Sequence, residues 1–453
     1  MAQAASRILQ TLPPGPKGRF LAGNAFDLGG GDWLGFFTRS VRDYGDVVFF
    51  KFFNLSMCLV VHPDDIEQVL VRNASNFVKS RDYRALKPVL GEGLLTGEGA
   101  AWQRQRKLVQ PSFRHENIAA YAEIMADSAR QLLAAWRDGE TLDGHEEMMR
   151  VTLDIASKSL FGADVSRDAG RVAAALHEVT NQFMNLANWA FLLPEFFPLP
   201  STPRFRRATK ELDAVIYRII RERRAAKRRS QDLLGILLEL RDEEGCEMAD
   251  EQLRDEIMTL FVAGHETTAI ALSWAWYLLA EHPEAEAKLH HELCDVLGGR
   301  VPQFSDLGRL PYTEMVVKET MRLFPPAWGI GRQALKEFEI GSYRLPAGTT
   351  VFMAQWITHR DARFYPEPER FYPDRWKDDP IRNGRLPRFA YFPFGGGPRV
   401  CLGAGFAMME ATLLLATIAQ RFRLSLVTGQ SVEPAPQVTL RPKHGINVTL
   451  HKR

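Results

Sequence analysis

A single cysteine near the C-terminal end of the chain lies in a context that could make it a metal ligand or a nucleophile. Cys401 follows the Gly-Gly-Gly-Pro run of residues 395–398 and Arg399, and an apolar helix is expected after it. Three glycines and a proline cannot continue a helix or a central strand, so the backbone must turn tightly and approach another group closely. The start of a helix and a nearby arginine both favour a thiolate. A buried structural cysteine is commoner, but this grouping favours a functional thiol.

A carboxylate and two hydroxyls lie in the middle of the most apolar predicted helix, residues 257–280. A buried carboxylate such as Glu266 is unfavourable unless it is paired or has a function. Ala263 and Thr267 are four residues apart and share one helix face, so a small side chain leaves room beside a hydroxyl for a small ligand. For Thr268, a hydrogen bond back to the helix is the alternative. The helix is long enough to span a membrane, but its polar centre predicts a long core helix instead.

An oppositely charged pair, Glu319 and Arg322, is predicted on the inward side of another helix. Pro311 opens this helix and Pro325 ends it, and the two charges are three residues apart beside its apolar stripe. A surface pair would contribute only about 0.3–0.5 kcal/mol. An inward pair needs its remaining hydrogen bonds satisfied, so we predict a third partner.

A basic helix is predicted over residues 102–110, where Trp102 and Arg106 are four residues apart and share a face. Taken alone, such a pair is most often an arginine packed along an aromatic ring at the surface. Its meaning depends on whether the fold brings this helix close to Cys401.

The cysteine loop resembles the haem-binding signature of the cytochrome P450 haem-thiolate monooxygenases. The match is specific, because the residue types agree with that signature at seven or more fixed offsets: Phe394, Gly395, Gly396, Gly397, Pro398, Arg399, Cys401, Gly403, Phe406, Ala407 and Glu410. In that family the cysteine thiolate is the ligand on one side of the haem iron, and it favours cleavage of the O–O bond.

Three further segments resemble elements of the same family, in the family's order along the chain. Residues 263–268 (AGHETT) are similar to its oxygen-activating segment, and Glu319 with Arg322 matches its ExxR element. Residues 371–376 resemble the segment that supplies the third partner, here Arg375. This trio would brace the cysteine loop from behind, as a structural element.

The resemblance implies a b-type haem bound through Cys401. It makes Thr267 and Glu266 the catalytic residues, because the family's threonine steadies dioxygen and the adjacent acid helps to relay protons. Trp102, Arg106 and Arg399, with Lys79 and Arg332 as further candidates, would hold the haem propionates. The full set of expected cofactor-binding residues is Lys79, Trp102, Arg106, Ala263, Arg332, Phe394, Arg399, Cys401 and Gly403.

The resemblance covers nearly the whole chain and implies the cytochrome P450 fold, which is mainly α with a small β region, in a single large domain over residues 1–453. Residues 1–20 would form an extended N-terminal arm. With 45% hydrophobic and 25% charged residues, the composition is that of a globular protein with a large core. No linker or repeat marks a boundary. Two strands are expected within residues 49–61 and a hairpin within residues 338–353.

Charge, cysteine usage and the N-terminus indicate the partners and the location. A net charge of +2 gives no reason to expect nucleic acid. The four cysteines form no CxxC pair, which favours a reducing compartment. The N-terminus has no apolar run long enough for a signal peptide or membrane anchor, so we expect a cytoplasmic monomer. Residues 191–200 would roof the substrate pocket by the resemblance, and their apolar surface could also touch a membrane.

The implied reaction inserts one oxygen atom from O2 into a C–H or C=C bond of an apolar substrate. Electrons are expected from NAD(P)H through a ferredoxin or flavodoxin with its reductase, because the chain contains no flavin or iron–sulfur motif of its own. An acidic partner of this kind would dock on basic residues near the cysteine side: Arg104, Arg106, Lys107, Arg114, Arg382, Arg385 and Arg388.

The substrate is predicted less directly. The segment with Glu266 and two threonines is more similar to the fatty-acid-hydroxylating and microsomal-type branches, so long-chain fatty acids come first, followed by terpenoids, steroids and polyketides. Two other function classes remain open. One is a peroxide-using or non-redox haem-thiolate enzyme, whose relatives often lack the acid–threonine pair. The other is a haem sensor or binding protein, which would need no such pair.

Overall fold

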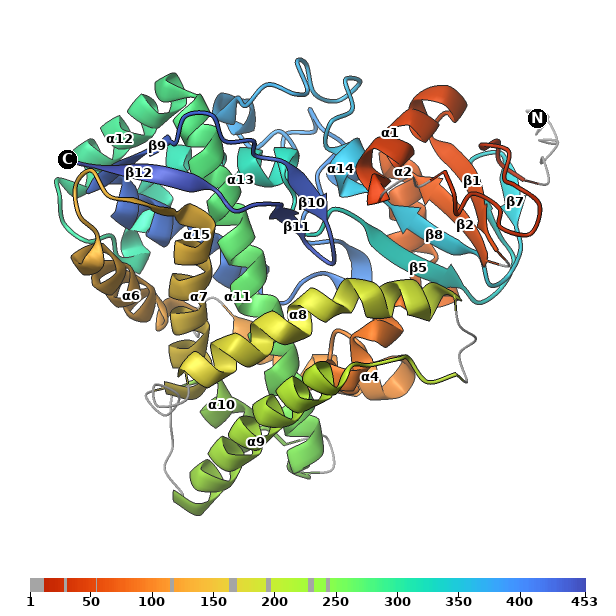
Figure 1. Cartoon of the computed structure of the whole chain (residues 1–453), viewed down its shortest axis with the longest axis horizontal. Helices are drawn as coiled ribbons and strands as arrows, with labels where there is room; N and C mark the ends of the chain where they lie inside the picture. The colour runs from red at the N-terminus through yellow and green to blue at the C-terminus, as the bar shows by residue number, and fades with distance from the viewer. Residues whose placement is uncertain are drawn as a thin grey trace.

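The computed structural model describes most of the chain, and the fold is mainly α with a small β region, as predicted (Figure 1). The described residues are 12–27, 31–53, 55–114, 118–162, 169–192, 197–226, 232–241 and 245–453. Both the predicted arm at residues 1–20 and the apolar region at residues 191–200 therefore lie partly outside them.

The helices form where apolar residues recur every three to four positions, so that one face of each can be buried. The longer ones are α1 (Trp33–Tyr44), α4 (Gly99–Val109), α6 (Ala122–Ala135), α7 (Gly144–Phe161), α8 (Ala169–Leu192), α9 (Pro203–Ala226), α11 (Asp250–Glu281), α12 (Pro283–Leu297), α13 (Pro311–Leu323) and α15 (Ala404–Ala419). The shorter ones are α2 (Pro63–Glu67), α3 (Lys87–Leu90), α10 (Leu233–Glu239) and α14 (Gln355–Thr358). Prolines occupy the first turn of α2, α12 and α13, where their missing N–H costs nothing.

The long helix α11 passes through the middle of the molecule (Figure 1). It confirms the core helix predicted at residues 257–280 and begins seven residues earlier. Its first half packs into one hydrophobic cluster with α8, α9 and α10, and its second half packs into another with α6, α7, α12, α13 and α15. Residues 263–268 belong to neither cluster, so this short stretch is left to face a cavity.

The main sheet has the strand order β1-β2-β8-β5-β3. The two strands predicted within residues 49–61 are confirmed as the antiparallel pair β1 (Val47–Phe52) and β2 (Leu55–Val60). β8 (Thr350–Met353) runs parallel to β2, and β5 (Ile330–Ala334) lies between β8 and β3 (Phe77–Lys79). Lys79 and Arg332 are directly opposite each other on β3 and β5, so their side chains leave the sheet on the same face.

The hairpin predicted over residues 338–353 is only partly correct. β6 (Phe338–Ile340) and β7 (Tyr343–Leu345) do form an antiparallel hairpin. The rest of the range leaves it, because β8 finds backbone partners on both sides in the main sheet.

The C-terminal segments also form strands. β9 (Phe422–Leu426) and β4 (Thr141–Asp143) flank β12 (Asn447–Lys452), and β10 (Pro434–Pro436) pairs with β11 (Leu440–Pro442). The β10–β11 hairpin is anchored at Leu440, whose N–H donates to the Pro326 carbonyl over 2.9 Å and whose carbonyl accepts from Trp274 Nε1 over 2.8 Å. Trp274 is on α11, so this hairpin is fixed to the central helix.

None of the helices within the described ranges is long and apolar enough to cross a lipid bilayer.

Candidate active site

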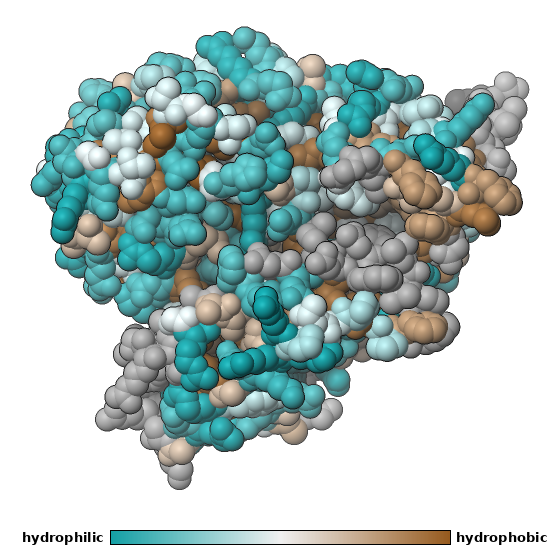
Figure 2. Space-filling model, in the orientation of Figure 1, coloured by the Kyte–Doolittle hydropathy of each residue, from teal (hydrophilic) through white to brown (hydrophobic). Residues whose placement is uncertain are grey.

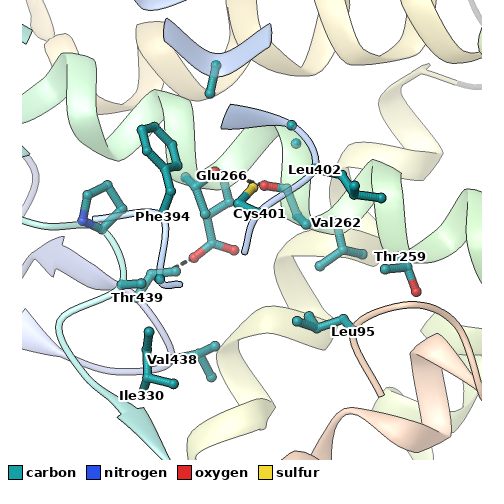
Figure 3. Close-up of a pocket in the computed structure, with 18 of the residues that line it drawn as sticks. Leu95, Thr259, Val262, Glu266, Ile330, Phe394, Cys401, Leu402, Val438 and Thr439 are labelled. Atoms are coloured by element: carbon teal, nitrogen blue, oxygen red, sulfur yellow. Dashed lines mark hydrogen bonds between the residues drawn. The ribbon is translucent and has the colours of Figure 1, made fainter. Parts of the chain in front are cut away.

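An internal cavity of about 550 Å³ lies between α11 and the cysteine loop, and most of its lining is apolar. Figure 3 shows Cys401 and Glu266 beside this space, with Val438 and Thr439 entering it from the β10–β11 hairpin. Every site residue predicted from the sequence lines the cavity: Lys79, Trp102, Arg106, Ala263, Glu266, Thr267, Arg332, Phe394, Arg399, Cys401 and Gly403.

The cysteine loop packs against the neighbouring π-helical segment Gln68–Arg72 so closely that glycine is required. Gly397 has a φ of +67°, and a Cβ built there would lie 1.8 Å from the Leu70 carbonyl oxygen. The Cys401 N–H donates to the Phe394 carbonyl over 3.0 Å, which closes the loop before α15 begins at Ala404. The predicted tight turn and close backbone approach are both confirmed.

The thiol of Cys401 has accessible surface because its side chain lines the cavity. Burial raises the pKa of this thiol, while the Gly403 N–H and the charge of Arg106 lower it. The expected help from the helix start is present as the Gly403 N–H, whereas the nearby charge is that of Arg106 and not of Arg399, and desolvation outweighs both. A bound metal ion would add a positive charge that favours the thiolate.

Arg399 belongs instead to a cluster of cations around Trp102. Its guanidinium pairs with Glu98 and lies 4.0 Å from the Trp102 ring centroid. Arg106 lies 5.7 Å from the same centroid and donates to the Val400 carbonyl over 2.8 Å. The shared face predicted for Trp102 and Arg106 is therefore part of the cavity wall.

Lys79 and Arg332 complete this cluster from the edge of the sheet. Lys79 Nζ donates to the Leu94 and Gly97 carbonyls over 3.1 and 2.8 Å, and burial and the charge of Arg399 lower its pKa to about 7. Arg332 is buried, with its Nη1 donating to the Gly331 carbonyl over 2.8 Å.

Positive charge is in excess in this cluster. Its four basic residues have three described carboxylates near them, Glu98, Asp82 and Glu256, and burial raises the pKa of Asp82 and raises that of Glu256 to about 7. A thiol on one wall, an apolar lining and surplus cations at one edge fit a haem, whose two propionates would balance those cations.

Helix α11 forms the wall that carries the predicted catalytic residues. The Thr267 hydroxyl donates to the Ala263 carbonyl over 2.8 Å, and Thr268 donates to Gly264 over 3.3 Å. The back-bond expected for Thr268 thus forms, but the shorter one is at Thr267. A Cβ at Gly264 would meet nothing within 4 Å, so the helix leaves open space at this point.

The carboxylate of Glu266 is buried and held by two residues of the β10–β11 hairpin that sequence reasoning missed. Its Oε1 accepts from Thr439 Oγ1 over 2.5 Å and from Arg441 Nη2 over 2.7 Å (Figure 3 draws the Thr439 bond). The rule that a buried carboxylate needs a partner implied that one exists. It could not say which, because these partners lie 173 and 175 residues further along the chain.

The ion pair Glu319–Arg322 is fully buried with an N–O distance of 2.9 Å, and the third partner predicted for it is confirmed. Arg375 Nε donates to Glu319 Oε1 over 2.8 Å. Trp376 Nε1, which was not predicted, donates to Glu319 Oε2 over 2.9 Å. Arg322 also donates to the carbonyls of residues 359, 368 and 370 over 2.6–3.0 Å.

The connection from this ion pair to the cysteine loop runs through a histidine that the sequence did not single out. His359 is fully buried, its carbonyl accepts from Arg322, and its Nε2 accepts from the Phe392 N–H over 3.0 Å. Burial lowers its pKa to about 3, so the ring is neutral. The trio therefore supports the loop from behind, as predicted, with His359 as the link.

Comparison with known proteins places the chain among relatives along nearly its whole length. The Cytochrome P450 family model matches residues 13–450. Cyclooctatin synthase of Streptomyces melanosporofaciens is 38% identical over 410 residues, which cover 89% of this chain and 88% of the relative.

Two further relatives have names that describe an oxygenation. Cyclooctat-9-en-7-ol 5-monooxygenase of Streptomyces melanosporofaciens is 35% identical over 400 residues, covering 87% of this chain and 86% of the relative. Pentalenene oxygenase of Streptomyces avermitilis is 31% identical over 421 residues, covering 92% of both.

Proposed function

The chain belongs to the cytochrome P450 family and is an oxidoreductase of that family; on that premise we propose that it hydroxylates or epoxidises an apolar terpenoid, with Cys401 as the iron ligand. The observation that carries this proposal is the cavity: Cys401 lines it together with Glu266 and Thr267, and the rest of its lining is largely apolar. Haem bound through Cys401 supplies the activation of O2. In the net reaction, substrate, O2, two electrons and two protons give the oxygenated product and water.

We assign proton handling to Thr267 and Glu266. The Thr267 hydroxyl lies on the cavity face of α11 and keeps acceptor capacity beyond its back-bond to Ala263. Glu266 is adjacent in the chain and lines the same cavity, so a proton taken up by the carboxylate has a short path to that hydroxyl. Lys79, Arg106, Arg332 and Arg399 would hold the propionates through their positive charge, and Trp102 would do so through its indole N–H.

A terpenoid is a better proposal for the substrate than the long-chain fatty acid preferred from the sequence. The names of two relatives describe oxygenation of pentalenene and of cyclooctat-9-en-7-ol, both terpenoids, and the comparisons give the fatty-acid alternative no support. The lysines and arginines in the lining are Lys79, Arg106, Arg332 and Arg399, which all belong to the Trp102 cluster. Among the lining residues that the structure describes, no separate cation is therefore offered to a fatty-acid carboxylate.

Electrons would come from NAD(P)H through a separate ferredoxin or flavodoxin and its reductase. Of the basic residues expected to bind this partner, Arg104, Arg114, Arg382, Arg385 and Arg388 are exposed, as is Lys107. Arg106 is half-buried and engaged with Val400 and Trp102, so we remove it from the docking surface. Reduction by an acidic partner should slow as the salt concentration rises; a rate independent of salt would contradict this surface. A cytoplasmic, monomeric enzyme remains our prediction.

The proposal is tested by spectroscopy and product analysis of the purified enzyme. The reduced, CO-treated protein should show the red-shifted Soret band of thiolate ligation, and Cys401→Ser should lose it. Cyclic terpenoids should shift the spin state of the ferric enzyme and give products labelled from ¹⁸O2. Fatty acids with a similar number of carbon atoms should do neither. Turnover with peroxide alone would favour the peroxide-using alternative, and tight haem binding without turnover of any substrate would favour the sensor.

A further inference from the structure

The two oxygens of the Glu266 carboxylate have different surroundings. Oε1 accepts from Thr439 Oγ1 over 2.5 Å and from Arg441 Nε and Nη2 over 2.9 and 2.7 Å. Oε2 accepts no hydrogen bond from any described residue, but it still has accessible surface. Because Glu266 lines the cavity, Oε2 is the oxygen left accessible from it. Oε1 is held by hydrogen bonds, while Oε2 is available to exchange a proton.

The residues that hold Oε1 are themselves rigidly placed. Thr439, at the bend before β11, and Arg441, in β11, both direct their side chains to the same Glu266 oxygen, while Leu440 between them is fully buried. The backbone of Leu440 is anchored by Trp274 Nε1, which belongs to the same helix as Glu266. Arg441 therefore has a fixed position relative to α11.

The other titratable groups close to this carboxylate carry no charge at neutral pH. Burial lowers the pKa of His145, on α7, to about 4, and its Nδ1 lies 3.0 Å from Ser273 Oγ. His265, on α11 itself, has a pKa lowered by burial as well. Within the described chain, the positive charge paired with Glu266 is that of Arg441.

We propose that Arg441 is a positioning residue for proton delivery: it fixes the Glu266 carboxylate through Oε1 and supplies its counter-charge, while Oε2 is left to the cavity for proton exchange. This inference rests on the proton-relay role proposed above for Glu266. The same segment places Val438 against the cavity, so a substrate seated there contacts the chain three residues from the group that orients the acid. Arg441 does not touch the reacting atoms and acts through Glu266.

The first experiment reads the charge of Glu266 directly, in the purified ferric enzyme without turnover. In Arg441→Met the buried carboxylate loses its counter-charge and should take up a proton at neutral pH. Infrared difference spectra should then show a protonated carboxyl band that is absent from the parent and from Arg441→Lys, and Glu266→Gln in the same background should remove it. Lys443→Met is the matched control, because Lys443 follows the same hairpin but pairs with Glu433 in solvent.

The second experiment measures product formed per pair of electrons consumed. Arg441→Met should lower this ratio about tenfold, which is part of the rate factor that a positioned acid contributes. The electrons that form no product should reduce O2, together with two protons, to hydrogen peroxide. Arg441→Lys should restore much of the ratio, and Lys443→Met should leave it unchanged. Thr439→Val, which removes one hydrogen bond and no charge, should give a smaller loss and serves if Arg441→Met folds poorly.

The outcomes separate this inference from the proposed function. If Glu266→Gln lowers the product ratio while Arg441→Met and Thr439→Val do not, and no new carboxyl band appears, Arg441 does not position the acid and the inference fails alone. If Glu266→Gln itself forms product as well as the parent, the relay role of Glu266 fails, and the inference fails with it.

Discussion

Two buried carboxylates, Glu319 and Glu266, are each paired with arginine, yet they differ in how many of their oxygens accept hydrogen bonds. Glu319 is fully buried with both oxygens occupied: Oε1 by Arg322, Arg375 and the Tyr372 N–H, and Oε2 by Arg322 and Trp376. Glu266 is held through Oε1, and its Oε2 is left to the cavity. A carboxylate with every position filled cannot exchange a proton without breaking the structure, whereas one with an open oxygen can.

The difference also appears in what lies beyond each carboxylate. The Glu319 network continues through Arg322 to three backbone carbonyls and through His359 to the cysteine loop. The surroundings of Glu266 lead to a hairpin that carries Val438 into the cavity. Figure 2 shows mostly hydrophilic residues on the coloured part of the visible face, and both carboxylates are buried beneath the molecular surface. The comparison teaches that completeness of hydrogen bonding, rather than burial, distinguishes Glu319 from the acid for which we propose a proton-relay role.

The largest effect should come from breaking the complete network. Arg322→Met leaves Glu319 buried with reduced compensation, so we expect the free energy of unfolding to fall by about 3–5 kcal/mol. Urea denaturation measures this, and the band of thiolate ligation should weaken with it. Lys288→Met, which breaks an exposed pair with Asp374, should cost under about 1 kcal/mol. Equal losses in the two variants would contradict the special status of Glu319.

The link between this network and the cysteine loop should show a characteristic pH dependence. His359→Leu removes the acceptor of the buried Phe392 N–H, so stability at pH 7 should fall by about 1–3 kcal/mol. The His359 ring has a pKa of about 3 in the folded protein against 6.5 as the ordinary value. Between these values only the unfolded chain binds the proton, so the parent loses stability as pH falls.

The advantage of the parent over His359→Leu should therefore shrink by about 1.4 kcal/mol for each pH unit below about 6.5. Denaturation curves at several pH values measure this difference. A difference that stays constant from pH 7 to pH 5 would show that the ring is not held neutral.

On the reactive side, Thr267→Val should change chemistry and leave stability nearly intact. The variant loses one back-bond to Ala263, worth under about 1.5 kcal/mol. The product formed per pair of electrons should fall about tenfold, because the hydroxyl to which we assign proton handling is gone. Thr417→Val loses the same kind of back-bond on α15, away from the cavity, and should leave the ratio unchanged. A loss of stability without a loss of product would make Thr267 structural.

The smallest effect is expected at the hairpin tip. Val438 has 42% of its surface exposed, toward the cavity, so Val438→Ala removes apolar contact with the substrate. Substrate binding, measured by the spin-state shift, should weaken about three- to tenfold. Leu335→Ala, at a comparably exposed residue that does not line the cavity, should leave binding unchanged. Equal binding by parent and Val438→Ala would remove the hairpin from the substrate site.

Local patterns in the sequence were enough for several individual elements, while the overall fold was expected from the family resemblance. The core helix around Glu266, the helix that begins at Pro311 and the first two strands follow from periodicity and turn residues, and the structure confirms them. β8 was assigned to the wrong neighbour, because a strand's partners depend on which edges are free in the folded sheet. Spacing shows that a segment is a strand, and only packing decides what it pairs with.

The candidate site shows the same difference between what the sequence indicates and what packing decides. Cys401, Glu266 and Thr267 stood out because their residue types and short-range spacing are unusual where they occur. Trp102 and Arg106 gained a role only through the family resemblance, and all five residues line one cavity. The effect of the helix start on the Cys401 pKa was visible in the sequence, whereas the desolvation of the thiol and the placement of Arg106 beside it were not.

The sequence by itself determined which residues could do chemistry: a thiol in a glycine-rich turn, an acid beside a threonine in a core helix, and an inward ion pair. The tertiary structure alone decided what surrounds them: Arg441 and Thr439 on Glu266, His359 behind the cysteine loop, and Arg399 on Glu98. The reason is physical. A residue's reactivity depends on the charges and hydrogen bonds within a few ångströms, and chain folding brings those from positions far apart in the sequence.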